Sequence, residues 1–521
     1  MPTPAGSSAS VCACPRDRVP LDPTGRLTMP RVPAWIAAGL AGAAAALGQA
    51  PWDLWWLALG AFALGLGAVA RARRPVLAGW VMGTAHFAVA LLWLTEPFYV
   101  DPTLTGWLAW PALGAAALGF GLFWAVGAGL GARGLGGPVG AALGLAAAEM
   151  ARSYVLTGFP WALPGHVLIG SPALPVADVA GQHGLTLAVL VGAGLVACAR
   201  PAATGAGLVL LAAPLALGAA TAPAPPPAGD APVVRLVQPN APQHLKWDPD
   251  WRPIFYARAV DLTEAGAVPD LAVWPETSMP NRLSSTESVR PEIAARAPAV
   301  VGTLRIDRTD APRNALVLLE GGTGRVLDTV DKHRLVPFGE YLPLPRVAEA
   351  LGLGPMAAQM AGVFASGPGP RLLETPVGRL MPMICYEAIF AQDLRRVARP
   401  RAILHLTNDA WFGTRVGPFQ HLALARLRAA EQGLPLLRAA NTGVSAVIDA
   451  RGRVLDALPL GEAGALDARL PPALPPTPHA RLGDLPVALL LLLLALLHLL
   501  VRPVDAARRG AQTGRHAPTA S

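Results

Sequence analysis

The stretch LMPMICYEAIF, residues 380–390, holds an apolar, β-favouring run that ends at Cys385 and is followed at once by Tyr386 and Glu387. Side chains at strand ends and in loops often carry function. Free cysteine is also among the most buried residue types, so Cys385 taken alone is better explained as a small core residue. Partners elsewhere in the chain are needed to distinguish a core thiol from a nucleophile.

The composition indicates a membrane protein. The 521-residue chain is 53% hydrophobic and 15% charged, with a mean hydropathy of +0.42, which is unusual for a soluble domain. Residues 33–221 are rich in Ala, Leu, Gly and Trp, whereas residues 231–470 have an ordinary soluble composition. A helix needs roughly 20 apolar residues to cross a bilayer.

We therefore expect about eight membrane spans: about seven helices in a bundle over residues 33–221, and a last one after the soluble block. The first two are short and separated only by GQAPWD (48–53), so they are either separate spans or a re-entrant pair. The predicted spans lie near residues 33–50, 54–70, 77–97, 106–132, 137–156, 182–198, 204–221 and 485–501.

The charges of the connecting loops predict the orientation of these spans, because cytoplasmic loops carry an excess of Lys and Arg. One set of loops and the C-terminal tail carry Arg71, Arg73, Arg74, Arg133, Arg200, Arg502, Arg508, Arg509 and Arg515. The opposite loops carry Asp53, Glu96, Asp101 and Asp178. We expect residues 1–32 to be a disordered cytoplasmic tail, residues 502–521 a cytoplasmic tail, and residues 222–480 an extracytoplasmic domain.

The net charge of +8 comes largely from these loop and tail arginines, so it indicates no nucleic-acid partner. The four cysteines are Cys12, Cys14, Cys198 and Cys385, and only Cys385 falls in the extracytoplasmic block. It cannot belong to a disulfide within that block, and a lone thiol in an oxidising compartment is notable. No metal-ligand spacing is evident, so we expect no metal and no cofactor.

The block between the Pro-rich linkers PAPPPAGD (223–230) and PPALPPTPHA (471–480) alternates between β-favouring and helical segments, which predicts a layered α/β domain. Strands are expected, besides the run that ends at Cys385, at 233–238, 271–274, 299–302, 315–319, 402–406 and 444–449, and helices near 251–267, 287–297, 389–397 and 419–432.

Two further motifs supply partners for the thiol. LAVWPE ends a strand with Glu276, and DKHRLVPFGEYLP places Lys332 and Glu340 in a polar loop. A carboxylate can take the thiol proton, and a cation can stabilise the thiolate and a later oxyanion. The backbone N–H of Tyr386 is a second oxyanion donor. Taken singly, Glu276 is better explained as a surface or capping carboxylate, Lys332 as a solvated lysine and Cys385 as a core cysteine.

Taken together, WPE…DK…LVPFGEYLP…CYE resembles the nitrilase, or carbon–nitrogen hydrolase, superfamily. Further segments resemble its membrane branch, the apolipoprotein N-acyltransferases, and the resemblance covers about residues 33–501. These segments are VQPN with Lys246–Trp247, HLTNDAWFG (405–413), QHLALARLRAAE (420–431), RAANTGVS (438–445) and, in the apolar half, TGFPW (157–161).

The resemblance implies an αββα sandwich carried on a helical membrane bundle, with Glu276 as general base, Lys332 as oxyanion stabiliser and Cys385 as nucleophile. It implies supporting roles in the pocket for Glu340, Tyr386 and Glu387, and a place for Trp247 on a mobile arm at the pocket mouth. Asn314 is left unassigned, because its flank PRNALV diverges from the family pattern.

The implied reaction is a two-step acyl transfer without a cofactor. Cys385 takes an acyl chain from a phospholipid, expected to be phosphatidylethanolamine, as a thioester. The chain then passes to the N-terminal amine of S-diacylglyceryl-cysteine on an apolipoprotein. The resemblance places a monomeric enzyme in the bacterial inner membrane, with its catalytic domain in the periplasm.

Three other interpretations remain open: a membrane-tethered amidase or nitrilase-type C–N hydrolase, a transporter with an outer domain, and an inactive scaffold. The spans contain few ionisable groups; His86 and the Glu149/Arg152 pair are exceptions. That pair is either a local ion pair or faces a substrate. The apolar segment MAAQMAGVF (356–364) is expected to be a lid element near the membrane.

Overall fold

The computed structural model describes residues 32–343 and 364–513, with side chains up to residue 501. The expected N-terminal tail and the expected lid segment 356–364 therefore lie outside the described residues, apart from residues 32 and 364. The predicted C-terminal tail begins inside a helix, because α16 runs from Leu485 to Thr513.

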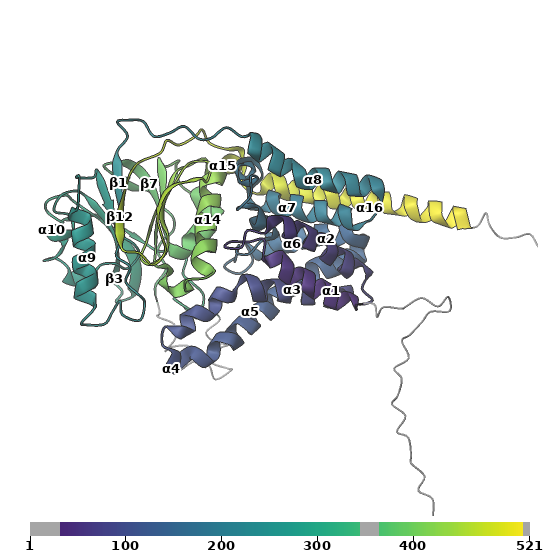
Figure 1. Ribbon diagram of the computed structural model, residues 1–521, viewed down its shortest axis with the longest axis horizontal. Coiled ribbons are helices and arrows are strands. Elements are labelled where there is room, and N and C mark those ends of the chain that lie inside the picture. The colour runs from purple at the N-terminus through teal and green to yellow at the C-terminus, as the bar shows by residue number, and fades with distance from the viewer. Residues whose placement is uncertain (1–31, 344–363, 514–521) are drawn as a thin grey trace, which may run out of the picture. The chain divides into compact units, whose positions relative to one another are not determined.

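The apolar half forms helices close to the predicted positions (Figure 1). They are α1 Ala34–Ala46, α2 Trp55–Arg71, α3 Pro75–Ala90, α5 Ala109–Trp124, α6 Gly137–Arg152, α7 Ala177–Ala197 and α8 Pro201–Ala220. The span predicted at 77–97 is not straight: α3 and the 3₁₀ helix Leu92–Tyr99 meet at 48°. A short helix, α4 (Pro102–Thr105), precedes α5.

Several of these helices could cross a membrane. In the described part of the chain, three helical stretches are long and apolar enough, Pro102–Arg152, Leu174–Ala197 and Pro201–Ala220, and the bent pair at Pro75–Tyr99 would make four. The stretch Pro102–Arg152 includes two of the predicted spans, with positive φ at Gly136 and Gly137 between them. Helices α1, α2 and the segment Leu485–Val501 are apolar but shorter. The count of eight spans stays a prediction.

Small residues allow the bundle helices to pack backbone against backbone. A Cβ atom on Gly42 of α1 would lie 2.0 Å from the carbonyl oxygen of Met82 in α3. A Cβ atom on Gly144 of α6 would lie 2.2 Å from the carbonyl oxygen of Gly127. Close contact through glycine is typical of helices that associate in lipid, where packing rather than water exclusion drives association.

The second half is an α/β sandwich of two six-stranded sheets, which confirms the predicted layered domain. The first sheet has the order β12-β1-β2-β3-β4-β5 and the second β11-β10-β9-β8-β7-β6. The strands are β1 Val233–Gln238, β2 Leu271–Val273, β3 Ala299–Ile306, β4 Pro312–Leu319, β5 Val326–Asp331, β6 Leu373–Thr375, β7 Gly378–Ile384, β8 Ala402–Thr407, β9 Leu436–Ala440, β10 Ser445–Ile448, β11 Val454–Leu458 and β12 Gly464–Arg469.

The centre of each sheet is parallel: β1, β2 and β3 in the first sheet, and β7, β8 and β9 in the second. The outer strands pair antiparallel. Because neighbouring parallel strands end at one edge of a sheet, the residues that follow β7 and β8 lie side by side, and a hydrogen bond from Asn408 after β8 to Glu276 after β2 joins the two sheets there. The ends of parallel strands are the usual place for a ligand site in α/β folds.

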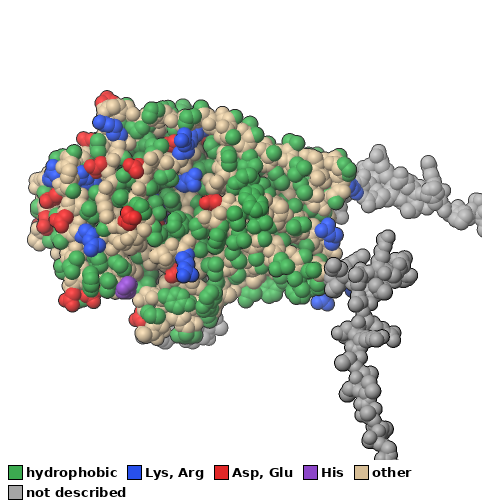
Figure 2. Space-filling model, viewed as in Figure 1, with side chains coloured by type: hydrophobic (Ala, Val, Ile, Leu, Met, Phe, Trp, Pro, Cys, Tyr) green, Lys and Arg blue, Asp and Glu red, His purple; other side chains and the backbone are tan. Residues whose placement is uncertain are grey.

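Helices cover both outer faces of the sandwich (Figure 1). Helices α9 (Arg252–Glu264) and α10 (Arg290–Ile293) lie over the first sheet, and α14 (Gly417–Gln432) lies over the second. Helix α14 also contacts α7 of the bundle. In Figure 2, charged side chains are scattered over the sandwich, whereas the visible face of the helical bundle is mostly hydrophobic.

Candidate active site

Glu276 follows the short, fully buried strand β2 and reaches the space between the sheets. The chain passes close to β3 here: a Cβ atom on Gly302 would lie 2.3 Å from the carbonyl oxygen of Pro275, so only glycine fits. Glu276 Oε1 accepts hydrogen bonds from Asn314 Nδ2 (2.7 Å) and Lys332 Nζ (3.2 Å). Its Oε2 accepts from the backbone N–H of Asn408 at 2.9 Å.

Lys332 comes directly after β5 and lies between two carboxylates. Its Nζ donates to Glu276 Oε1 at 3.2 Å and to Glu340 Oε1 at 2.9 Å, and its side chain is 1% exposed. Glu340 Oε2 also accepts from the backbone N–H of Val336, which fixes the loop that carries the carboxylate.

Cys385 begins the 3₁₀ helix Cys385–Ile389 directly after β7, with φ of +51°. Glu387, two residues on, holds this turn to the Lys332 loop. Its Oε2 accepts from Ile384 N–H at 2.8 Å, and its Oε1 accepts from His333 N–H at 2.7 Å. The turn at Cys385 and the loop that begins at Lys332 therefore share one buried carboxylate, that of Glu387.

The charges of the site favour an ionised carboxylate beside a neutral thiol. Burial works to raise the pKa of Glu276, but the positive charge of Lys332 and the hydrogen bond from Asn314 outweigh it, and the pKa is lowered. Burial and the negative charge of Glu276 raise the pKa of the Cys385 thiol, although Lys332 opposes them. Burial disfavours a charged Lys332, but Glu276 and Glu340 together raise its pKa well above the ordinary value.

Tyr386 points away from the carboxylates toward the bundle. Its hydroxyl donates to the carbonyl oxygen of Gly158 at 3.4 Å, and its ring packs edge-on against Phe390 at 5.1 Å. Burial raises the pKa of the Tyr386 phenol. Tyr386 therefore links the turn at Cys385 to the loop that contains TGFPW.

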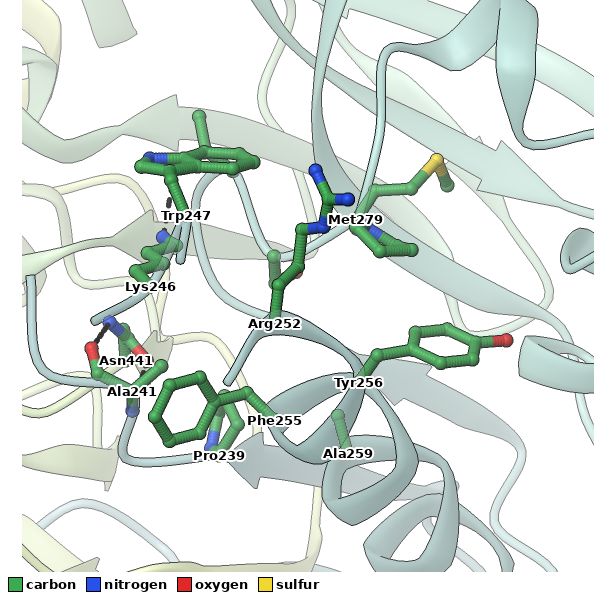
Figure 3. Close-up of a pocket in the computed structure, with 13 residues that line it drawn as sticks. Pro239, Ala241, Lys246, Trp247, Arg252, Phe255, Tyr256, Ala259, Met279 and Asn441 are labelled. Carbon is green, nitrogen blue, oxygen red and sulfur yellow. Dashed lines mark hydrogen bonds between the residues drawn. The ribbon is translucent and has the colours of Figure 1, made fainter. Parts of the chain in front are cut away.

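Trp247 lies at the protein surface, apart from the buried carboxylates and Lys332. Its side chain is 40% exposed and lines a surface pocket that also includes Arg252 and Thr277, the residue after Glu276. Figure 3 shows its ring above Lys246, and Lys246 Nζ lies 5.8 Å from the ring centroid. Lys246 Nζ in turn donates to the backbone carbonyl of Glu276 at 3.2 Å, and burial lowers its pKa to about 8.

The structure adds residues to which the sequence analysis gave no role. Asn314 contacts both Glu276 and Glu340, at 2.7 and 3.2 Å. Asn408, inside the quoted HLTNDAWFG, supplies the backbone donor to Glu276, and its side chain accepts from Asn441 at 2.8 Å. His333 lies between two carboxylates, with Nδ1 at 2.6 Å from Glu387 Oε1 and Nε2 at 3.0 Å from Asp393 Oδ2.

The three polar groups singled out in the apolar half are buried and make contacts within the protein. Arg152 and Glu149 form an ion pair of 2.6 Å, and both side chains are at most 1% exposed. Arg152 also donates to the carbonyl of Trp161 at 3.0 Å. His86 stacks on Trp124 at 4.8 Å and contacts the carbonyl of Ala162 at 3.2 Å. The local ion pair is the interpretation that these contacts favour.

The two-sheet sandwich has the architecture of a carbon–nitrogen hydrolase domain, and within it the hydrogen-bonded Glu276 and Lys332 lie near Cys385. A family model described as carbon-nitrogen hydrolase matches residues 293–474, and a second, described as apolipoprotein N-acyltransferase N-terminal domain, matches residues 41–195.

Curated relatives match nearly the whole chain. Apolipoprotein N-acyltransferase from Rhodopseudomonas palustris is 35% identical over 511 residues, covering 89% of this chain and 94% of the relative. The proteins of the same name from Brucella melitensis and Caulobacter vibrioides are each 36% identical, covering 84% and 87% of this chain and 89% and 92% of their own lengths. The chain belongs to the apolipoprotein N-acyltransferase family.

Proposed function

We propose that this enzyme moves a fatty acyl chain from a phospholipid to the N-terminal amine of the S-diacylglyceryl-cysteine of an apolipoprotein, through a thioester on Cys385. The observation that carries the proposal is the buried cluster in which Glu276, Lys332 and Glu340 are hydrogen-bonded beside the Cys385 turn. The names of the relatives supply the substrate class.

Glu276 is the general base. An ionised carboxylate beside a neutral thiol suits a mechanism in which the proton moves to Glu276 as sulfur attacks the ester carbonyl. The S–C bond then forms, the ester C–O bond breaks, and the proton on Glu276 returns to the departing alkoxide, so a lysophospholipid leaves.

The second half of the reaction uses the same groups in the same order. The free amine attacks the thioester carbonyl, Glu276 accepts a proton from nitrogen, and the sulfur of Cys385 leaves and is reprotonated. The α-amine has a pKa of about 8, so a base beside it also helps to keep the attacking nitrogen neutral. The products are an amide and the original enzyme.

Lys332 and the backbone N–H of Tyr386 stabilise the oxyanion in both steps. Glu340 keeps the ammonium in place, and Glu387 keeps the Cys385 turn against the Lys332 loop. Trp247, an exposed residue next to Lys246, is the aromatic residue at the mouth of the active-site pocket.

We further propose that about eight helices hold the protein as a monomer in the bacterial inner membrane, with the catalytic domain in the periplasm. The asymmetry of the loop arginines supports this orientation. Both substrates are lipids of that membrane, so a catalytic domain held between bundle helices and α16 is kept near its substrates.

A tethered C–N hydrolase is the second candidate, because the carbon-nitrogen hydrolase model matches residues 293–474. An assay of the purified enzyme with phosphatidylethanolamine and a synthetic diacylated lipopeptide distinguishes the transferase from the hydrolase. The transferase gives a lipopeptide heavier by one acyl chain, and the same lipopeptide with an acetylated N-terminus gives no product. Release of free fatty acid at the same rate with either peptide, without a heavier lipopeptide, would show that water and not the amine accepts the acyl chain, and would overturn the proposed transferase.

A further inference from the structure

The backbone of Cys385 has an unfavourable conformation. Its φ of +51° lies in the left-handed region, which side chains other than glycine seldom adopt. Such strain persists only when surrounding groups hold it, and it is often found at functional sites. Cys385 is the first residue of its 3₁₀ helix, so this conformation also sets the direction of the Tyr386 N–H.

The rings of two buried histidines contact the backbone carbonyl oxygen of Cys385. His405 Nε2 lies 3.1 Å from it and His421 Nε2 lies 3.2 Å from it. His405 is in β8 and His421 is in α14, and both are 0% exposed. Both contacts are to the backbone oxygen and not to the sulfur, so they are unlike the contact of a histidine base with a thiol.

The ring of His405 has a fixed proton position. Arg438 Nη1 donates to its Nδ1 at 2.8 Å, so the proton of the neutral ring is on Nε2 and is donated to the Cys385 carbonyl. Burial and the charge of Arg438 lower the pKa of His405, which keeps the ring neutral. Arg438 is held in turn by Asp409 Oδ2, and the Asp409 side chain is also fully buried.

The ring of His421 lies between two acceptors. Its Nδ1 is 2.9 Å from Asp409 Oδ1, and its Nε2 faces the Cys385 carbonyl. A neutral His421 ring has one N–H, which it donates either to Asp409 or to the Cys385 carbonyl. In both cases His405 donates to the carbonyl. The face of the His421 ring stacks on Trp161 of the bundle, with centroids 5.7 Å apart.

We infer that His405, supported by Arg438 and with His421 as its neighbour, is a positioning residue that holds the Cys385 backbone in the left-handed conformation and so directs the thiol and the Tyr386 N–H at the substrate carbonyl. The inference rests on the proposed function, because it assigns His405 a role in acylation of Cys385. The histidine touches neither sulfur nor Glu276 in the described contacts, so it acts through the backbone.

Two variants of His405 separate positioning from other roles. His405→Gln places an amide N–H near the position of Nε2, whereas the shorter His405→Asn keeps an acceptor near Nδ1 for Arg438 but cannot reach the carbonyl. His498→Gln is the matched control, because His498 Nε2 also contacts a backbone carbonyl, that of Gly136, at 3.2 Å, far away in sequence on α16.

The readouts are the rate of acyl-enzyme formation with phosphatidylethanolamine vesicles, its dependence on phospholipid concentration and pH, and the melting temperature. We expect His405→Asn to lower the acylation rate about 10- to 100-fold, with the half-saturating phospholipid concentration and the acid limb of the pH profile unchanged. His405→Gln should recover to within about threefold of wild type, and His498→Gln should match wild type.

A full acylation rate in folded His405→Asn would overturn the inference, and so would loss of the acid limb, which would make His405 a base. If His405→Asn does not fold, His405→Gln decides: a folded variant near the wild-type rate supports positioning, and a folded but inactive one overturns it. Failure of wild-type enzyme to form any acyl-enzyme would instead overturn the proposed function.

Discussion

The side-chain amide of Asn314 donates a hydrogen bond of 2.7 Å to Oε1 of Glu276, the same oxygen that accepts from Lys332. Asn314 lies within β4, two strands away from β2 in the first sheet, and its side chain is buried. A neutral donor at this position stabilises the ionised carboxylate without competing for a proton.

Replacing Asn314 with Leu is expected to raise the pKa of Glu276, because the hydrogen bond from Asn314 is one of the interactions that lower it. The base must be ionised to act, so the acid limb of the pH profile of kcat/KM should move to higher pH. The maximal rate should fall roughly 10-fold, as for loss of a hydrogen bond to a charged group. An unchanged acid limb would show that Asn314 does not act on the base.

Lys332→Met should remove the positive charge at the oxyanion and lower the acylation rate on the order of 10²-fold or more. Arg325→Met is the control for loss of a cation in the same domain, since Arg325 pairs with Glu320 at 2.9 Å on the surface, with 68% of its side chain exposed. Turnover of Lys332→Met equal to that of Arg325→Met would mean that Lys332 does not have this role.

His333 predicts a pH dependence of stability. Burial opposes its charged form, but the hydrogen bonds to Asp393 and Glu387 outweigh it and raise its pKa to about 9. A histidine whose folded pKa is raised stabilises the fold fully below the unfolded pKa of about 6.5, and this contribution is lost as pH rises through 9.

The melting temperature of His333→Gln should therefore fall below that of wild type at pH 6, and the gap should narrow between pH 7 and pH 10. Differential scanning calorimetry of both proteins in the same detergent measures this difference in melting temperature. A gap that stays constant over this range would contradict the raised pKa.

The proposed orientation predicts the side of the membrane on which each loop lies. Alkaline phosphatase, which is active only outside the cytoplasm, should be active when fused after Leu319 and inactive when fused after Arg73. The opposite pattern would reverse the orientation inferred from the loop arginines.

The residues at strand ends could be predicted from the sequence because their positions are local. β1 was predicted at 233–238 and is Val233–Gln238. Lys332 and Cys385 each follow a strand directly, and Glu276 lies shortly after the end of β2 at Val273. The prediction that these three residues meet in space came only from the family resemblance, because a single sequence does not reveal the order of the strands in a sheet. Asn314 was left unassigned because its flank PRNALV diverges from the family pattern, and it is the pairing of β3 with β4 that places it beside the site.

Other elements were missed because they lack a clear pattern. β9 contains Arg438, which interrupts an apolar run and is buried in contact with Asp409 and His405. β11 and β12 are edge strands. β12 exposes Asp467 and Arg469, which weakens its hydrophobic pattern, and β11 is the short run VLDAL, which shows no apolar–polar alternation. The helix expected at 287–297 shortens to Arg290–Ile293, since the chain turns into β3 soon after.

The mass of the intact protein after incubation with phosphatidylethanolamine alone tests the central claim most directly. Wild-type enzyme should gain the mass of one acyl chain on the peptide that contains Cys385, and neutral hydroxylamine should remove it, as expected for a thioester. Cys385→Ser is nearly isosteric and should fold, but it should show no such adduct and no transfer to lipopeptide. Absence of an adduct on wild-type protein, together with full transfer by Cys385→Ser, would contradict the account and leave Cys385 as a core thiol.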